Sequence, residues 1–397
     1  MEFSIFYHHE RDASMTDAPQ TQLLAEPREV DVVAIERELT QLWRAAAEGN
    51  AATASAPVMR ACSLNLIVVA AEPHQLDETG DMVGEVTVEH PARIFLVAAD
   101  RDSAAGSLAA WISARCSLPV PGGKQVCCEQ ITLSAAGEEV KKIPSIITSL
   151  LVPDIPTFVL WKSVVRSSDF LLQALSAIAN RVIIDSSDAP DPEATLRAWG
   201  TYLHQPSVSF GDLAWTHVTP WRAVVANAFN PESMRPLLGE IRKVQIAYST
   251  TMKPVHSGLS QALLLGGWLA QRLRWEVTSP LTSDAARRNT ASFRAGTEAA
   301  RHAVTLAIHP VEARAGFPGG IESIVIGTDG MTLEFSATPH PRCVAVTRRT
   351  QSESIQEMVP VIVEKTEAEL IAQELEITVR DAGYEAVMDK LLQILGQ

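Results

Sequence analysis

Short apolar runs rich in β-branched residues alternate with helical patterns over the first half of the chain. The runs "SLNLIVVAA", "RIFLVAAD", "VCCEQITL", "PTFVLWK" and "RVIIDSS", between residues 63 and 187, each have the length and composition of a buried strand. Helical patterns such as "DFLLQALSAIA" and "PEATLRAWGTYL" lie between them or follow them. This alternation predicts an α/β fold, with a largely parallel sheet flanked by helices in an N-terminal domain.

Further segments of this half are expected to be helical. The sequence "DVVAIERELTQLWRAAAE" (31–48) spaces its apolar residues as an amphipathic helix does. We also predict a helix between strands for "SAAGSLAAWISARC" (103–116), and a helix that Pro144 kinks or begins within "GEEVKKIPSIITSLL" (137–151). Residues 1–30 lack clear periodicity and are expected to form a flexible tail.

The pattern changes in the second half of the chain. Four apolar runs, "HAVTLAIHP", "IESIVIG", "MTLEFSA" and "CVAVTRR", follow one another with turns such as "GTDG" and predict a strand meander. The residues from about Val363 predict two charged terminal helices. We therefore expect an N-terminal α/β domain over 31–165 and a C-terminal α+β domain over 166–397, with a second possible boundary near residue 240.

The composition limits the classes of partner. Apolar residues make up 46% of the 397 residues and charged residues 20%, which allows a large core in two or three domains. The net charge of −14 disfavours nucleic acid and anionic membranes as partners, because both are polyanions. The sequence shows neither a membrane span nor the apolar core of a secretion signal. We therefore expect a cytoplasmic protein.

Two adjacent cysteines, Cys127 and Cys128, lie in the strand predicted for "VCCEQITL". Neighbouring side chains of a strand point to opposite faces, so the two thiols cannot bind one metal ion, and a disulfide between them would be strained. With no C-x-x-C pair, no metal site is expected. Free thiols packed in the core are the first interpretation, and a redox function with a more distant thiol such as Cys116 or Cys62 is the second.

Glu129 shares its strand face with Cys127 and apolar residues. A carboxylate on such a face needs a partner or an exposed strand end. One interpretation is a buried ion pair with an arginine such as Arg93 or Arg181, and the other is a contact to a partner protein.

Polar residues also follow a predicted strand in "IDSSD" (184–188). Ligands of open parallel sheets bind beyond the carboxyl ends of the strands, so Asp185 and Ser186 could bind a sugar or a partner. The alternative is that these two side chains cap the segment that follows them.

The segment "DLAWTHVTPWR" (212–222) is rich in tryptophan and charge. Trp221 falls on the apolar stripe of a predicted helix and is expected in the core, whereas Arg222 falls off this stripe. Asp212 and Trp215 precede the helix on a turn. An aromatic side chain beside an arginine is typical of an interface, and burial in the core is the alternative.

The loop "YSTTMKPVHSG" (248–258) places Lys253, His256 and Ser257 before a predicted helix. These side chains could bind an anion at the helix N-terminus. Elsewhere the sequence contains no G-x-G-x-x-G, Walker A, H-E-x-x-H or G-x-S-x-G motif. These absences favour a binding or assembly function over an enzyme.

Several phrases of the sequence, in order, resemble the OpcA family of glucose-6-phosphate dehydrogenase assembly proteins. The phrases are "EHPARIFLVAAD", "VCCEQITL", "SLLVPDIPTFVLWK", "RVIIDSS", "DLAWTHVTPWR" and "ALLLGGWLAQRLRW", and they extend from residue 89 to residue 275. The resemblance implies a non-catalytic partner without a cofactor of its own, which binds and activates that dehydrogenase in the oxidative pentose phosphate pathway. In photosynthetic members this activation is linked to redox state. The alternative function is a sensor or enzyme for a phosphorylated sugar.

Overall fold

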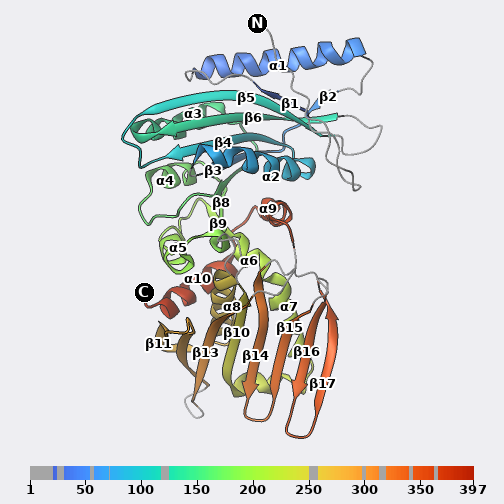
Figure 1. Cartoon of the computed structure of the whole chain (residues 1–397), viewed down its shortest axis with the longest axis vertical. Helices are drawn as coiled ribbons and strands as arrows, with labels where there is room; N and C mark the ends of the chain where they lie inside the picture. Colours follow the sequence, from blue (N-terminus) through green and yellow to red (C-terminus); the bar gives the residue numbers. More distant parts are fainter. Residues whose placement is uncertain are drawn as a thin grey trace.

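The computed structural model of the chain describes ten stretches and contains two large sheets with helices packed against them (Figure 1). The described residues are 21–24, 31–53, 58–70, 72–117, 125–249, 258–296, 301–312, 319–338, 343–361 and 365–397.

The first sheet, which we call sheet A, has nine strands within the described ranges and contains the apolar runs of the first half. Seven strands follow one another as neighbours from β5 to β9, β1 pairs with β5 at one edge, and β2 pairs with β6. The bounds are β1 Thr21–Leu24, β2 Val58–Arg60, β3 Leu64–Ala70, β4 Ala92–Asp100, β5 Ser107–Ser117, β6 Gln125–Ala136, β7 Thr157–Trp161, β8 Arg181–Ile184 and β9 Ser209–Asp212.

Six parallel strands of sheet A have the order β6-β4-β3-β7-β8-β9. Counted along the chain from β3 and leaving out β5, this is the order 3-2-1-4-5-6 of doubly wound dinucleotide-binding sheets. Strands β3, β4, β7 and β8 are buried along nearly their whole length, which explains their uninterrupted apolar sequences. The predicted fold class of the N-terminal half is confirmed.

Helices cover both faces of sheet A. One face packs in the main core with α1, α3, α4 and α5, and the other packs with α2 and α9 in a second apolar cluster. Helix α9 comes from the far end of the chain and lies beside α2 (Figure 1). The bounds are α1 Val32–Thr53, α2 Leu76–Glu89, α3 Ile143–Leu150, α4 Phe170–Ser176, α5 Pro192–Gly200 and α9 Glu367–Leu375, with 3-10 turns η1 Pro73–Gln75, η2 Gly137–Lys142 and η3 Ser186–Asp188.

One sequence prediction in this half is wrong. The segment 103–116 was expected to be a helix, but residues 107–117 form strand β5, which pairs antiparallel with β6. Ala110, Ile112 and Ala114 alternate on one buried face, whereas Ser113 and Arg115 are buried on the other. A strand satisfies this two-residue period, and the small residues that favour a helix do not outweigh it.

In the part of the chain that the structure describes, the second sheet, sheet B, has eight strands in the order β11-β12-β13-β10-β14-β15-β16-β17. All its pairs are antiparallel except β10 with β13. Of the four strands predicted as a meander, β14, β15 and β16 are consecutive neighbours, whereas the first, β13, is separated from β14 by β10. The meander continues into β17, which was not predicted. The bounds are β10 Ile241–Ser249, β11 Glu276–Ser283, β12 Asn289–Ala295, β13 His302–Val311, β14 Gly320–Thr328, β15 Thr332–Ala337, β16 Cys343–Arg349 and β17 Ser354–Pro360.

Helices α8 and α10 pack against each other and close the core of sheet B. The remaining helices of this half join the two sheets, and the two predicted terminal helices are present as α9 and α10. The bounds are α6 Leu213–His217, α7 Thr219–Ala228, α8 Gly258–Arg272 and α10 Ala382–Leu395, with the 3-10 turn η4 Arg235–Glu240.

The two sheets divide the chain between Asp212, the end of β9, and Ile241, the start of β10. A boundary at residue 165 would separate β8 and β9 from the sheet to which they belong, because both strands follow that position. How the chain divides into folding units stays a prediction. In the segment predicted as a tail, residues 21–24 form β1 and pair with β5, and the rest up to residue 30 lies outside the described residues.

Candidate functional site

Polar side chains gather at the carboxyl ends of β7, β8 and β9, where parallel sheets bind their ligands. We call this group the strand-end cluster, and its members are Lys162, Asp185, Ser186, Asp212 and Glu367. Lys162 follows β7 and forms an ion pair with Glu367 in the first turn of α9. The carboxylate of Asp212 accepts hydrogen bonds from the backbone N–H of Ser186 at 3.1 Å and of Ala214 at 2.9 Å.

The two aspartates of the strand-end cluster hold their protons more tightly than aspartates in water. Burial, helped by the charge of Asp185, raises the pKa of Asp212 to about 7. Burial, helped by the charges of Asp188 and Glu367, raises the pKa of Asp185 to about 6. Perturbed carboxyl groups of this kind are found at catalytic sites and in buried structural networks alike.

The contacts of the strand-end cluster are mainly structural. Asp185 accepts from the N–H of Ser187 at 2.9 Å and caps η3, which confirms the capping interpretation for Asp185. Asp212 caps α6 in the same way. Ser260 of α8 donates to the carbonyl oxygen of Ser186 at 2.7 Å. Helices α8 and α9 therefore lie where an open sheet would receive a ligand.

The residues of sheet A do not fit a dinucleotide. In doubly wound sheets the pyrophosphate lies on a glycine-rich turn between the first strand and its helix. Here the corresponding turn between β3 and α2 has the sequence "AEPHQ" and contains no glycine. Across the described residues, no group of three or more histidine, cysteine or acidic side chains could hold a metal ion.

Glu129 is the centre of a buried ion cluster between sheet A and α1. Its carboxylate binds Arg93 through Nη2 at 2.7 Å and Nε at 2.8 Å, and Arg60 through Nη2 at 2.7 Å. Trp43 of α1 donates its indole N–H to Oε1 at 2.5 Å. Of the two arginines predicted as its partner, Arg93 is confirmed, whereas Arg181 pairs with Glu374. The pairing explains how a carboxylate that is 3% exposed is tolerated.

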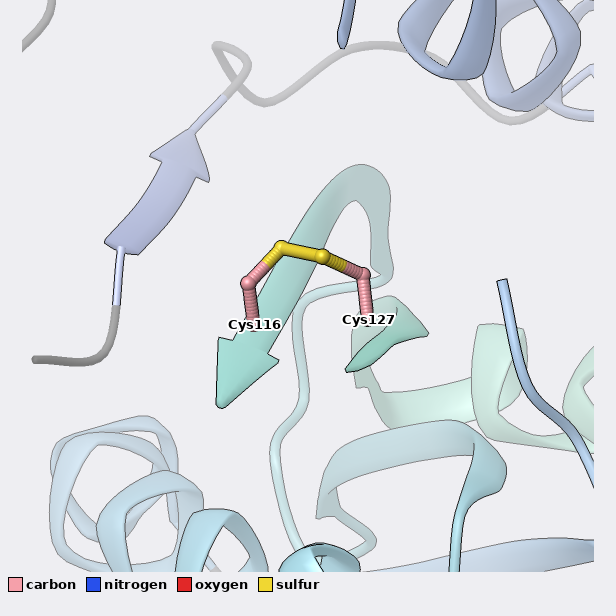
Figure 2. Close-up of a disulfide and its surroundings, with 2 residues drawn as sticks. All are labelled: Cys116 and Cys127. Carbon is pink, nitrogen blue, oxygen red and sulfur yellow. A yellow bond between two sulfur atoms is a disulfide. The ribbon is translucent and has the colours of Figure 1, made fainter. Parts of the chain in front are cut away.

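Cys116 and Cys127 form a disulfide that joins β5 to β6 (Figure 2). These residues face each other directly in the antiparallel register, so their side chains lie on the same face. The expectation that Cys127 is a free core thiol is therefore wrong, since a strand neighbour outside the "CC" pair supplies its partner. Cys128 points to the opposite face and is a free, buried thiol, and burial raises its pKa to about 11. Such a thiol is poorly reactive.

The disulfide is expected to contribute about 2–3 kcal/mol to the free energy of unfolding, because it closes a short loop in the unfolded chain. The double substitution Cys116→Ser/Cys127→Ser should therefore lower that free energy by this amount in urea unfolding without reductant. Reductant should destabilise the unsubstituted protein and leave the double variant unchanged, with Cys343→Ser as the free-thiol control. Unfolding curves of the unsubstituted protein that coincide with and without reductant would contradict the prediction.

The tryptophan-rich segment packs inside the molecule. Trp215 and Trp221 are 6% and 2% exposed, and the indole N–H of Trp215 donates to Asp381 at 3.0 Å. The guanidinium of Arg222 lies 3.3 Å from the ring centroid of Trp215, where it makes a cation–π contact. The core interpretation is thus confirmed for both tryptophans. Lys253, His256 and Ser257 lie outside the described residues.

Sequence reasoning missed Lys162 and Glu367 of the strand-end cluster. Lys162 directly follows a predicted strand, so the criterion that found Asp185 could have found it too. For Glu367 the sequence carries no such signal, because α9 reaches β7 across 205 positions of sequence.

Two family models match the chain in succession, and both describe parts of a glucose-6-phosphate dehydrogenase subunit. The model of its N-terminal domain matches residues 83–201, and the model of its C-terminal domain matches residues 208–388. Proteins named as OxPP cycle protein OpcA from Synechocystis sp. and Nostoc punctiforme are each 32% identical, over 52% and 49% of this chain. The matches cover 42% and 40% of these relatives, less than half of their length.

Solved structures are similar only at low identity. KijD10, a 3-ketoreductase from Actinomadura kijaniata in complex with TDP-benzene and NADP, is 13% identical with a TM-score of 0.46, over 84% of this chain and 96% of that one. Levoglucosan dehydrogenase in complex with NADH and L-sorbose is 11% identical with a TM-score of 0.48, over 84% and 97%. At TM-scores below 0.5 these similarities carry no argument. Among the described residues, no helix is long and apolar enough to span a membrane.

Proposed function

Since the chain belongs to the OpcA family, we propose that it is a non-catalytic subunit that binds glucose-6-phosphate dehydrogenase and promotes the active oligomer of that enzyme. The observation that carries the proposal is the match of both subunit domain models, in order, over residues 83–201 and 208–388. The proposed place of action is the cytoplasm, at the entry of the oxidative pentose phosphate pathway.

Two features of the site support a non-catalytic function. The turn after β3 lacks the glycines that let a backbone approach a pyrophosphate, and helices α8 and α9 cover the ends of β7 and β8. In this proposal the nicotinamide cofactor and the sugar phosphate belong to the dehydrogenase, and this chain contributes binding free energy alone.

Activation by a non-catalytic subunit requires a difference in affinity. The subunit can shift the dehydrogenase toward its active state only as far as it binds the active state more tightly than the inactive state. A stable complex of this kind buries at least about 1,000 Å² in total. Because Trp215 and Trp221 are buried inside this chain, the contact surface must be formed by other residues.

Strand β17 is the proposed contact edge. It is the last strand of sheet B, and across the described residues no strand pairs with its outer edge. Two of its apolar side chains are exposed, Ile355 at 45% and Met358 at 53%. An open strand edge with apolar side chains can bind an extended segment of a partner through backbone hydrogen bonds.

Substitutions on β17 test this surface. Ile355→Asp and Met358→Asp together should weaken binding of the dehydrogenase at least about tenfold, because a charge in a buried contact costs more than about 1.4 kcal/mol. Val379→Asp, at a residue that is 72% exposed outside both sheets, is the matched control and should bind normally. If the unsubstituted chain, the double variant and Val379→Asp all bind the dehydrogenase with equal affinity, the contact does not involve β17.

The proposed function is tested by co-purification with the dehydrogenase of the same organism, followed by steady-state kinetics. We expect a complex at micromolar concentration and a higher kcat/KM for glucose 6-phosphate when the subunit is present. The finding that would refute the proposal is a dehydrogenase whose rate is unchanged at saturating subunit and which does not co-elute with it.

The disulfide offers a way to regulate this binding. Disulfides in reducing compartments are usually transient and redox-sensing, so we propose that reduction of the Cys116–Cys127 bond alters affinity for the dehydrogenase. The same kinetics with oxidised and reduced subunit test this idea. Equal activation by both forms would leave the bond a purely structural feature.

The alternative of a sugar-phosphate sensor gains no support from the strand-end cluster. The cluster has three carboxyl groups and one lysine, and this lysine is already paired with Glu367. A phosphate would meet excess negative charge there. Calorimetry with glucose 6-phosphate on the isolated chain discriminates this alternative, and tight binding would favour it.

A further inference from the structure

A pocket of about 200 Å³ lies on the face of sheet A beneath α2, away from the strand-end cluster. Its base comes from neighbouring strands and includes Leu96, Arg115 and Gln130, and its rim on α2 includes Asp77 and Asp81. Figure 1 shows α2 lying across this face of the sheet. The volume is below the ~300–1,000 Å³ typical of drug-sized ligands, so it fits a small metabolite.

Arg115 is the main polar group of this pocket. The residue is 8% exposed, and its Nε donates to Oε1 of Gln130 at 2.6 Å. Gln130 in turn donates to Oγ1 of Thr132 at 3.2 Å, so the base of the guanidinium is held in place. Its outer nitrogens are less well satisfied, because the nearest carboxylate among the described residues is Asp81, at 3.9 Å from Nη1.

A glycine on α2 makes room for this guanidinium. A Cβ atom at Gly80 would collide with Nη2 of Arg115, so a larger residue there would force the arginine to move. Ser113 lies on the same strand face, two residues before Arg115, and its buried hydroxyl has no hydrogen-bond partner among the described residues. Arg115 lines the pocket, so a bound oxyanion would accept charge-assisted hydrogen bonds from its outer nitrogens.

The charges around the pocket distinguish between classes of oxyanion. Arg115 supplies one positive charge, whereas Asp77 and Asp81 supply two negative charges one helical turn apart at the rim. A dianionic phosphate would be repelled by these two carboxylates. A zwitterion would place its carboxylate on the arginine and its ammonium at the aspartates.

The walls of the pocket select the rest of such a molecule. Leu76 and Leu96 are apolar, and Trp111 presents a half-buried ring beside them. We propose that this pocket binds a small zwitterion with an apolar body, of the α-amino acid class, through Arg115, Asp77 and Asp81. The proposal is independent of the dehydrogenase, because it concerns a surface of this chain alone.

Calorimetry on the full chain tests the proposal, with L-leucine and L-methionine as first probes and the other common amino acids after them. We expect saturable binding of at least one amino acid below about 10 mM. L-leucinamide, which lacks the carboxylate, and 4-methylpentanoate, which lacks the ammonium, should bind at least about tenfold more weakly. Failure of every amino acid to bind, equal binding of these analogues, or preferential binding of inorganic phosphate would overturn the proposal.

Variants connect the binding to this pocket. Asp81→Asn changes an exposed rim residue and should weaken amino acid binding at least about tenfold without affecting the fold. Arg115→Met should do the same if circular dichroism shows it folded. Glu78→Gln, on the same turn of α2 but outside the pocket lining, should bind as the unsubstituted protein does. Unchanged binding by Asp81→Asn would refute the assignment even if Arg115→Met fails to fold.

Discussion

The substitution Glu374→Ala is expected to lower the free energy of unfolding by about 3–5 kcal/mol, because it leaves a buried guanidinium without its counter-ion. Arg181 and Glu374 are each 1% exposed, and Oε2 of the glutamate accepts from Nη2 at 2.6 Å and from Nε at 2.9 Å. Gly211 permits the pair, since a Cβ there would lie 2.6 Å from Nη2 of Arg181. Urea unfolding of the purified variant measures the loss.

Two further variants separate the ion pair from helix effects. Glu376→Ala changes an exposed residue just after α9 and should shift stability by no more than about 0.5 kcal/mol. The double variant Arg181→Met/Glu374→Leu removes both charges and should be more stable than Glu374→Ala. If Glu374→Ala were as stable as Glu376→Ala, the buried pair would not hold α9 on sheet A.

The substitution Asp212→Asn is expected to make the protein more stable at pH 8, by an amount on the order of a few kcal/mol. The carboxyl group of Asp212 has a pKa of about 7 in the folded protein, against 3.8 for an ordinary aspartate. Because the folded value is raised, the neutral carboxyl contributes fully below pH 4, and this contribution is lost as the pH rises to 7. An asparagine oxygen can still accept from the N–H groups of Ser186 and Ala214.

The measurement is a series of urea unfolding curves from pH 4 to pH 8. The difference in stability between Asp212→Asn and the unsubstituted protein should grow up to about pH 7 and then level off. Asp191→Asn changes the N-cap of α5 at an exposed position and controls for other effects of pH. A difference for Asp212→Asn that does not change with pH would show that the carboxyl is not neutral in the folded state.

Local patterns in the sequence predicted the fold class because parallel buried strands leave continuous apolar runs. The two-residue alternation of side chains along a strand placed Glu129 on an apolar face and so predicted that it needs a partner. Arg93 was one of the two arginines named as that partner. The alternation also separated Cys127 from Cys128, and it left open whether Cys127 is a free core thiol or pairs with a more distant thiol such as Cys116, which the structure shows as its disulfide partner. Strand β5 was misassigned because its alanines and serines show little contrast between its two faces, which leaves helix propensity as the stronger signal.

Contacts between distant parts of the chain could not be predicted from the sequence. Arg181 and Glu374 are 193 positions apart, and no periodicity indicates that a C-terminal helix returns to the first sheet. The pocket at Arg115 depends in the same way on how α2 crosses β4 and β6. Trp221 was predicted in the core from its place on the apolar stripe, and it is buried. For Trp215 the sequence left interface and core open, because composition alone does not distinguish the two.

The most direct test of the central proposal is the mass of the dehydrogenase in solution, measured by analytical ultracentrifugation with and without this chain at micromolar concentration. The proposal predicts that the chain joins the dehydrogenase and shifts it to a larger oligomer with a higher specific activity. Two species that sediment independently, with the dehydrogenase unchanged in mass and rate, would contradict it.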